Sequence, residues 1–223
     1  MIFASPSVKR GQMTFKNRKH AGSRLAEAVR PHVWDRALVL AIPRGGVPVA
    51  ARIHEILDLD MDMLISRKLP FPDNPESGFG AVAEDGTVYL IPRAEEAVPG
   101  PLIDRTVEEQ KREIQRRIQT LRGGRKTPSM NGRQVILADD GIAMGSTMIA
   151  SIQCCRNQGA ASVLVTVPVC SPRISTEIAN QADRLIALVQ PSWFRAVAQV
   201  YETWADLTDE DVFAVLSESA VSK

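Results

Sequence analysis

The chain has little cysteine, little histidine and almost no net charge, and each scarcity excludes a class of protein. Its 223 residues include three cysteines and three histidines, and the formal net charge is +1. An odd cysteine count argues against a disulfide framework, and the scattered histidines offer no zinc-type spacing. The near-neutral charge argues against a basic surface for nucleic acid. We therefore expect a reduced, cytoplasmic protein, and we do not expect a nucleic-acid partner.

Long apolar runs are missing as well. No stretch approaches the roughly 18 apolar residues of a membrane span, and the first twenty residues lack the apolar core of a secretory signal. We therefore expect no membrane association and no secretory leader. With 44% hydrophobic residues, the chain is long enough to bury one core, and we expect a single domain over residues 1–223.

One segment, Val135–Met148, combines the features that a phosphate site needs. The apolar run Val135–Ala138 is typical of a strand buried on both faces, and two carboxylates, Asp139 and Asp140, follow it directly. Amides at the start of the next helix suit a phosphate, and the carboxylates suit hydroxyl groups or a hydrated Mg²⁺. The turn between them is made of small, hydroxyl and thioether residues, among them Gly141, Ala143, Met144, Gly145, Ser146 and Thr147.

The spacing differs from that of other phosphate-binding motifs. Gly141 and Gly145 are separated by three residues rather than four, and Ser146 stands where a Walker loop carries Lys. The G-x-G-x-x-G fingerprint of dinucleotide folds is absent. The alternative that remains is an ordinary turn from strand to helix behind an acidic strand end.

A second strand–loop–helix unit lies earlier in the chain. The apolar run Ala37–Ile42 predicts a buried strand, and the loop that follows contains Arg44, Gly45 and Gly46. Glycine lets the backbone approach an anion closely, and arginine adds a fixed charge with a bidentate fork. This pattern therefore predicts a second anion site.

A third strand is expected at Met61–Ser66, ending in Arg67 and Lys68. Two cations at a strand end form either a solvated rim or an anion site. The Pro-, Asp- and Asn-rich stretch Pro70–Ser77 is interpreted as a loop. The basic residues 16–20 are interpreted as a solvated helix face, with the alternative that Arg18 points toward a phosphate.

Strands and helices alternate through most of the remaining chain. We expect helices over Phe15–Trp34, Val47–Leu57, Leu102–Leu121, Ile149–Gln158 and Arg173–Gln181, and strands over Phe79–Ala83, Thr87–Ile91, Ser162–Val169 and Leu185–Val189. This order predicts an α/β fold with a doubly wound parallel sheet, and a hairpin over 79–91. The strands at 37–42 and 135–140 should lie close together, with their carboxyl ends forming the ligand crevice.

Residues 135–147 resemble the ribose-phosphate signature of type I phosphoribosyltransferases, in which two acids follow a hydrophobic strand and a Thr-Gly-x-Thr-like turn comes next. Residues 15–29 also resemble the opening of an uncharacterised bacterial and archaeal branch. The resemblance spans about residues 15–215. It implies a core at about 15–169, an inserted hairpin and helix at about 70–130, a small C-terminal hood at about 170–223, and a homodimer.

By the same resemblance, Asp139 and Asp140 hold Mg²⁺ and the ribose hydroxyls of phosphoribosyl pyrophosphate (PRPP), and residues 143–147 hold its 5′-phosphate. The loop 43–46 resembles the pyrophosphate loop of the xanthine–guanine branch, which often contains a cis peptide. That likeness implies a cis peptide near Arg44. It also implies that pyrophosphate is bound by Arg44, Gly45, Gly46, Arg67 and Lys68, with Lys68 preferred over Arg67 as the catalytic cation.

Two further expectations come from the family. A mobile lid is implied within residues 70–100. An aromatic residue of the hood, Trp193 or Phe194, is implied to stack on the acceptor base, and the alternative is that both pack in the core.

The implied activity is the Mg²⁺-dependent phosphoribosylation of a nitrogenous base or amine, with release of pyrophosphate. Two positions depart from the family pattern. Met144 stands where Thr is usual, and Ala143 stands where the 6-oxopurine enzymes carry an Asp base. These departures argue against a hypoxanthine- or guanine-type reaction. They also leave open a non-catalytic sensor of PRPP or nucleotides, and a hydrolase that uses water as acceptor.

Overall fold

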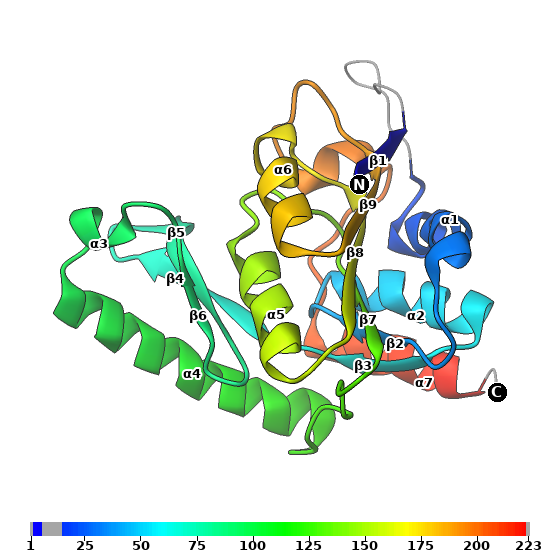
Figure 1. Cartoon of the computed structure of the whole chain (residues 1–223), viewed down its shortest axis with the longest axis horizontal. Coiled ribbons are helices and arrows are strands. Elements are labelled where there is room, and N and C mark those ends of the chain that lie inside the picture. The colour runs from blue at the N-terminus through cyan, green and yellow to red at the C-terminus, as the bar shows by residue number, and fades with distance from the viewer. Residues whose placement is uncertain (1, 6–14, 222–223) are drawn as a thin grey trace.

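The computed structural model of the chain describes residues 2–5 and 15–221, and its centre is a six-stranded sheet in the order β1-β9-β8-β7-β2-β3 (Figure 1). Each neighbouring pair of these strands is parallel. The strands are β1 (Ile2–Ser5), β2 (Leu38–Ala41), β3 (Asp60–Met63), β7 (Gln134–Ala138), β8 (Ser162–Val169) and β9 (Arg184–Val189). The edge strand β1 has no counterpart among the predicted elements.

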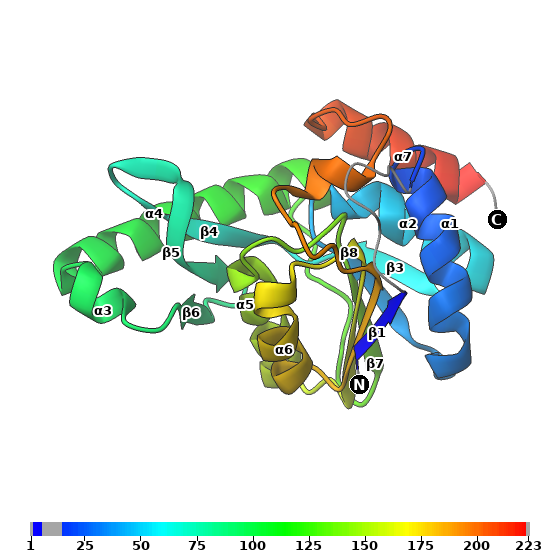
Figure 2. The same cartoon turned by 90° about the horizontal axis from the view of Figure 1, so that it is seen from above.

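Helices cover both faces of this sheet (Figure 2). One face carries α1 (Arg18–Val29), α2 (Gly46–Leu57) and α7 (Asp209–Val221), and the other carries α5 (Ser146–Asn157) and α6 (Pro172–Gln181). Side chains of β2 alternate between the two cores, with Leu38 and Leu40 on the α5 side and Val39 and Ala41 on the α2 side. The predicted doubly wound α/β fold is confirmed.

The first helix is shorter than predicted. Asn17 caps it by accepting a hydrogen bond from the His20 amide at 2.9 Å. Pro31 has no amide hydrogen to continue an α-helix, and the chain passes into the 3₁₀ turn Arg30–His32. Among the described residues, no helix combines the length and the apolar character needed to cross a membrane.

The order of the strands places a topological switch point between β2 and β7. The chain moves outward from β2 to β3, and then crosses to the other side of β2 and continues outward through β7, β8 and β9. The register pairs Leu38 with Val135 and Ala41 with Ala138, so both strands end at the same level. Ligands of doubly wound folds bind at this point, and the expected proximity of the two motifs is confirmed.

Residues 66–122 form a separate structure that we call the arm, which projects to one side of the main sheet (Figure 1). It contains an antiparallel sheet of β4 (Ser66–Phe71), β5 (Asn74–Ala83) and β6 (Val88–Leu90), followed by α3 (Ala94–Ala97) and α4 (Gly100–Arg122). One face of this sheet packs on α4 through Leu69, Phe79 and Val82, and the other packs on α5 through Ala81 and Ala83.

The arm corrects two predictions. The third parallel strand ends at Met63 rather than at Ser66, because Ser66 already begins β4 of the arm. The stretch Pro70–Ser77 is not a loop but the tip of the β4–β5 hairpin, and the pairing shifts register at Pro70, where a ladder donor is missing. The predicted hairpin over 79–91 and the amphipathic helix that became α4 are both confirmed.

A buried ion pair, which we call the latch, ties the arm to the main sheet. Arg122 at the end of α4 donates to both carboxylate oxygens of Glu84, at 3.0 and 2.9 Å, and to the carbonyl of Met63 at 3.1 Å. Glu84 also accepts from the Ile65 amide at 2.9 Å. The two side chains are 1% and 7% exposed, so the latch fixes the helix end, the hairpin turn and the end of β3 to one another.

Candidate functional site

The two acids at the end of β7 point to different places. Asp139 lines a cavity of about 280 Å³ at the carboxyl edge of the sheet. The other described residues that line this cavity are Lys68, Glu76, Gly78, Gly141, Ile142, Ala143, Met144, Gly145, Ser146, Thr147, Met148 and Val197. The structure thus gathers eight of the predicted site residues around one space, including the entire turn 143–147.

The turn after the acids is shaped to present helix amides. Gly145 has φ = +81°, a conformation that favours glycine, and a Cβ there would stand 2.4 Å from Ile174. Helix α5 then begins at Ser146, and its first intrahelical hydrogen bond runs from the Ile149 amide to the Gly145 carbonyl. The amides before Ile149 have no partner within the helix and carry the positive end of its dipole. Amides arranged in this way are suited to a phosphate or another anion.

Met144, which departs from the family pattern, does not fill the turn. Its side chain is 66% exposed, so it stands at the rim of the cavity and leaves the α5 amides accessible. Met in place of the usual Thr therefore removes one hydroxyl donor from the turn but keeps its backbone amide donors.

Asp140 is held in an ion pair behind the cavity. Arg18 Nε donates to Asp140 Oδ2 at 2.8 Å, and the two side chains are only 10% and 14% exposed. The same guanidinium donates to the Ala205 carbonyl at 2.9 Å and stacks on Trp204, 3.7 Å from the ring centroid. The interpretation of residues 16–20 as a solvated face is therefore wrong for Arg18. Its side chain points inward because it pairs with the buried carboxylate of Asp140, 122 residues further along the chain.

The C-terminal segment closes over the same acid. The Tyr201 hydroxyl donates to the backbone carbonyl of Asp140 at 2.7 Å, and its ring packs between Phe15 and Trp204. Burial raises the pKa of Tyr201 above its usual range, and the charge of Asp140 adds to the rise. Tyr201 therefore remains a neutral donor that fixes the backbone where β7 ends.

Crowding of negative charge makes Asp139 receptive to a cation. Burial raises the pKa of Asp139 well above its usual range, and the carboxylate of Asp140 raises it further. Burial also raises the pKa of Asp140, while Arg18 opposes that rise. Arg18 pairs directly with Asp140 and offsets only part of the rise at Asp139, so a cation in the cavity would further stabilise the charged form of Asp139.

The donors at Asp139 fit a magnesium ion. Mg²⁺ in proteins is usually held by one or two carboxylates and completes its shell with waters and substrate phosphates. Asp139 offers such a carboxylate beside the turn 143–147, with Oδ1 also accepting the Asp140 amide at 2.8 Å. Such a site needs no cluster of three ligands, and within residues 2–5 and 15–221 no cluster of that kind is found.

The loop after β2 lies directly against the acids. A Cβ on Gly45 would stand 2.0 Å from Asp140 Oδ2, and one on Gly46 would stand 2.4 Å from the Ala138 carbonyl oxygen. Only glycine allows this approach. The expected cis peptide is present between Pro43 and Arg44. The Arg44 side chain extends toward α7, with Nη1 3.5 Å from Asp209 Oδ1.

Arg67 and Lys68 are neighbours in β4 and therefore point to opposite faces. Lys68 lines the cavity, where its Nζ donates to the Glu76 carbonyl at 2.6 Å. Arg67 faces α4, where its Nε donates to Gln110 Oε1 at 3.1 Å. The preference for Lys68 agrees with this placement. Glu76 and Val197 also line the cavity, and no sequence pattern indicated either of them.

The two aromatic residues expected to contact an acceptor base, Trp193 and Phe194, have different surroundings. Trp193 is 66% exposed, whereas Phe194 packs on the core cluster that contains Phe15 and Tyr201. Among the described residues of the segment 193–197, Val197 lines the cavity, and neither aromatic residue does. Stacking of Trp193 on an acceptor base therefore stays a prediction, and Phe194 has a packing role.

The chain is similar to known proteins over most of its length. Residues 14–203 match the family described as the phosphoribosyl transferase domain. Two proteins of Mycobacterium tuberculosis, one from each of two strains, bear names that give phosphoribosyl transferase activity as provisional. Each is 36% identical over 210 residues, a match that covers 92% of this chain and 47% of theirs. The chain thus spans about half the length of these relatives.

A solved structure is also similar along nearly the whole chain. The protein TT1426 from Thermus thermophilus has 37% sequence identity and a TM-score of 0.79, with 92% of this chain and 99% of that chain covered.

Proposed function

Because the chain belongs to the phosphoribosyl transferase family, we propose that it is a phosphoribosyltransferase that uses PRPP and Mg²⁺. It transfers the phosphoribosyl group to a nitrogenous base or amine and releases pyrophosphate. The observation that carries the proposal is the cavity in which Asp139, Lys68 and the amide-rich turn 143–147 face one another.

Each part of PRPP has a matching part of the cavity. The amides at the start of α5 suit the 5′-phosphate, and Asp139 suits the ribose hydroxyls as a hydrogen-bond acceptor. Lys68 and the loop 43–46 suit the pyrophosphate. Bound Mg²⁺, held by Asp139 with Asp140 beside it, would supply positive charge to the pyrophosphate and ribose oxygens.

The reaction breaks the bond between C1′ and the pyrophosphate oxygen and forms a bond from C1′ to the acceptor nitrogen. Pyrophosphate leaves with the bonding electron pair, and positive charge develops on the ribose ring. The protein contributes by positioning PRPP and by stabilising this separation of charge. Lys68 neutralises the leaving pyrophosphate, and the carboxylate of Asp139 faces the ribose.

Asp140 acts in this proposal chiefly as a positioning residue. Its ion pair with Arg18 and its contact with Gly45 hold the end of β7 against the loop after β2. This arrangement sets the spacing between the ribose end and the pyrophosphate end of the cavity.

The proposal extends to the cellular environment, the oligomeric state and the range of acceptors. The three cysteines, all in the described part of the chain, are buried and free, which supports the expected reduced, cytoplasmic environment. We also propose a homodimer, the common form of the family.

Ala143 supplies no carboxylate at the cavity rim, so the proposal does not extend to acceptors that need an Asp base at that position.

The test is pyrophosphate release from PRPP and Mg²⁺ in the presence of a panel of nucleobases and amines. We expect release that depends on one acceptor and is lost in Asp139→Asn, while Asp104→Asn, an exposed acid on α4, behaves like wild type. Release without any acceptor would indicate a hydrolase. PRPP binding without release would favour the sensor, and the absence of both would contradict the proposal.

A further inference from the structure

Arg18 is held on three sides by groups that come from distant parts of the chain. Its Nε donates to Asp140 Oδ2 at 2.8 Å, and its Nη1 donates to the carbonyl of Ala205 at 2.9 Å. The carbon of its guanidinium also lies over the ring of Trp204, 3.7 Å from the centroid. Because the side chain is only 10% exposed, these contacts fix the guanidinium beside the second acid.

The backbone that carries Arg18 is tied to the C-terminal segment. A parallel bridge pairs Phe15 with Tyr201, and amide hydrogen bonds of 2.9, 2.8 and 3.0 Å link residues 15–16 with residues 200–203. The Tyr201 hydroxyl donates to the carbonyl of Asp140 at 2.7 Å, and its ring lies 5.1 Å from that of Trp204. The fold itself therefore sets the distance between the start of α1 and the end of β7.

Asp140 is closed off from the cavity that its neighbours line. Arg18 bonds to its Oδ2 atom, and the backbone of Gly45 comes so close that a Cβ there would stand 2.0 Å from the same oxygen. Among the described residues, Asp139 and Gly141 line the cavity, whereas Asp140 does not. A protein-bound Mg²⁺ usually keeps several waters. The surroundings of Asp140 leave no room for them, and those of Asp139 do.

The charges lead to the same conclusion. A divalent cation at Asp140 would have to displace Arg18, whose guanidinium would stay buried against Trp204 without a carboxylate. A buried charge that has lost its partner is strongly unfavourable, and two cations at one carboxylate repel each other. Arg18 is therefore a competitor that a metal ion does not readily replace.

We propose that Arg18 is a positioning residue that acts as a permanent counter-ion of Asp140 and thereby reserves Asp139 as the single carboxylate for the metal. The inference rests on the proposed function and deepens it, because the metal is the Mg²⁺ that accompanies PRPP. The family resemblance implies that both acids hold the metal, whereas in this chain one acid holds the metal and the other holds the loop after β2. The remaining metal ligands are then waters and substrate oxygens.

The test is a titration of the protein with Mn²⁺ alone, followed through the electron paramagnetic resonance signal of the free ion. Mn²⁺ shares the octahedral oxygen coordination of Mg²⁺. Asp139→Asn should weaken Mn²⁺ binding about tenfold or more. The double variant Arg18→Gln/Asp140→Asn removes both charges of the ion pair, keeps the net charge and retains two polar side chains of similar size. It should bind Mn²⁺ as wild type does.

The single change Arg18→Gln exposes Asp140 to a competing cation and should tighten Mn²⁺ binding about tenfold or more. Arg18→Lys keeps the counter-ion and should return the affinity to that of wild type. Arg30→Gln is the matched control for net charge, because it removes one positive charge just after α1 from an exposed pair with Glu27. It should leave Mn²⁺ affinity unchanged. Circular dichroism checks that each variant is folded before the titration.

Loss of Mn²⁺ binding in the double variant would show that Asp140 is a metal ligand and would overturn the inference, and this comparison holds even if Arg18→Gln alone does not fold. Equal gains in Arg18→Gln and Arg30→Gln would overturn it too, and so would the absence of Mn²⁺ binding in both wild type and Arg18→Gln. If Mn²⁺ follows the predicted pattern but PRPP is not turned over, the inference stands and the proposed function fails. If PRPP is turned over and the double variant loses Mn²⁺, only the inference fails.

Discussion

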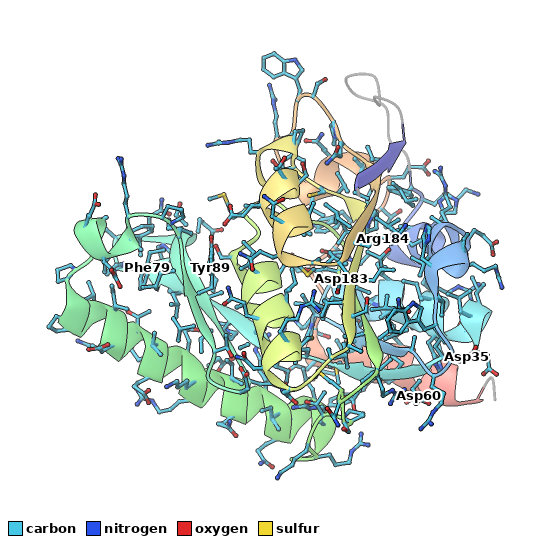
Figure 3. All side chains as sticks on the ribbon, viewed as in Figure 1. Asp35, Asp60, Phe79, Tyr89, Asp183 and Arg184 are labelled. Carbon is cyan, nitrogen blue, oxygen red and sulfur yellow. The ribbon has the colours of Figure 1, made fainter. Side chains whose placement is uncertain are left out.

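The carboxyl edge of the parallel sheet and the arm both reach the cavity, but they are built and held in different ways. The edge offers backbone amides and short carboxylates, fixed where two buried strands end side by side. The arm offers long cationic side chains from a separate small sheet with its own hydrophobic cluster. It is joined to the core by the latch, by packing on α5, and by the bond from the Tyr89 hydroxyl to Glu177, with Tyr89 visible between the small sheet and α5 (Figure 3).

This difference suggests a division of labour. In the proposed function, the short side chains and backbone amides of the sheet edge would fix the position of the ribose phosphate. The long cationic side chains of the arm would reach toward the leaving group and neutralise its charge during the proposed reaction. If this division is correct, changes in the two regions should have separable effects.

The largest effect on the sheet edge is expected from Arg18→Met. This change leaves the buried Asp140 without its partner, and breaking a buried pair in this way costs roughly 3–5 kcal/mol of unfolding free energy. Urea denaturation measures the loss. The matched control is Arg30→Met at the other end of the same helix region, where the exposed pair with Glu27 contributes about 1 kcal/mol or less. Equal losses in the two variants would contradict a special role for the Arg18 pair.

A change of similar size in the arm is expected from Arg122→Met, which leaves Glu84 buried and unpaired at a cost of roughly 3–5 kcal/mol. We expect the arm to open before the main sheet does. Burial raises the pKa of Cys154 to about 12, and the nearby Asp85 of the hairpin turn contributes to the rise. Labelling with a thiol reagent, read by peptide mass spectrometry, should therefore accelerate at Cys154 and not at Cys170. Equal acceleration at both cysteines would mean that the arm and the core unfold as one unit.

The contact between the two loops can be tested with a single methyl group. Gly46→Ala places a Cβ 2.4 Å from the Ala138 carbonyl oxygen, so the loop and β7 must separate. We expect a loss of roughly 1–3 kcal/mol of stability, together with weaker pyrophosphate binding. Gly100→Ala is the control, because a Cβ there meets nothing within 4 Å. Wild-type pyrophosphate binding in Gly46→Ala would show that this spacing does not matter.

The smallest effect is a pH dependence of the arm. The hydrogen bond from Arg116 is the largest of the effects that lower the pKa of Glu113 from 4.5 to about 2. A carboxylate whose pKa is lowered by folding stabilises the folded state, and the full stabilisation is present at pH values above the pKa of the unfolded state. This stabilisation is lost as the pH falls from 4.5 through about 2. The difference in melting temperature between wild type and Glu113→Gln should therefore shrink over that window. Since Glu113 is 27% exposed, we expect less than ~1 kcal/mol, and a constant difference would contradict the assignment.

The sheet edge could be predicted from the sequence because its functional groups are neighbours along the chain. Asp139, Asp140 and the turn that follows form one contiguous segment, and the glycines of the other loop carry their conformational meaning locally. Four- and five-residue apolar runs such as Leu38–Ala41 predict buried strands, whatever lies around them.

The remaining features depend on contacts between distant residues. Four basic or imidazole side chains occur within residues 16–20, and nothing local distinguishes Arg18, which is selected by a carboxylate 122 residues away. The polar start of β5 has no alternating pattern, because that end of the hairpin is exposed. Pairing across the hairpin, rather than propensity, therefore decides that Arg67 faces α4 while Lys68 faces the cavity.

The most direct test of the central claim is calorimetric titration of PRPP, with and without Mg²⁺, into wild type and Asp139→Asn. We predict saturable, Mg²⁺-dependent binding to wild type, and an affinity lower by about a hundredfold, or ~2.7 kcal/mol, in a variant that remains folded. Equal affinity in Asp139→Asn would remove Asp139 from the site. No saturable binding to wild type at millimolar PRPP would contradict the assignment of this cavity to PRPP.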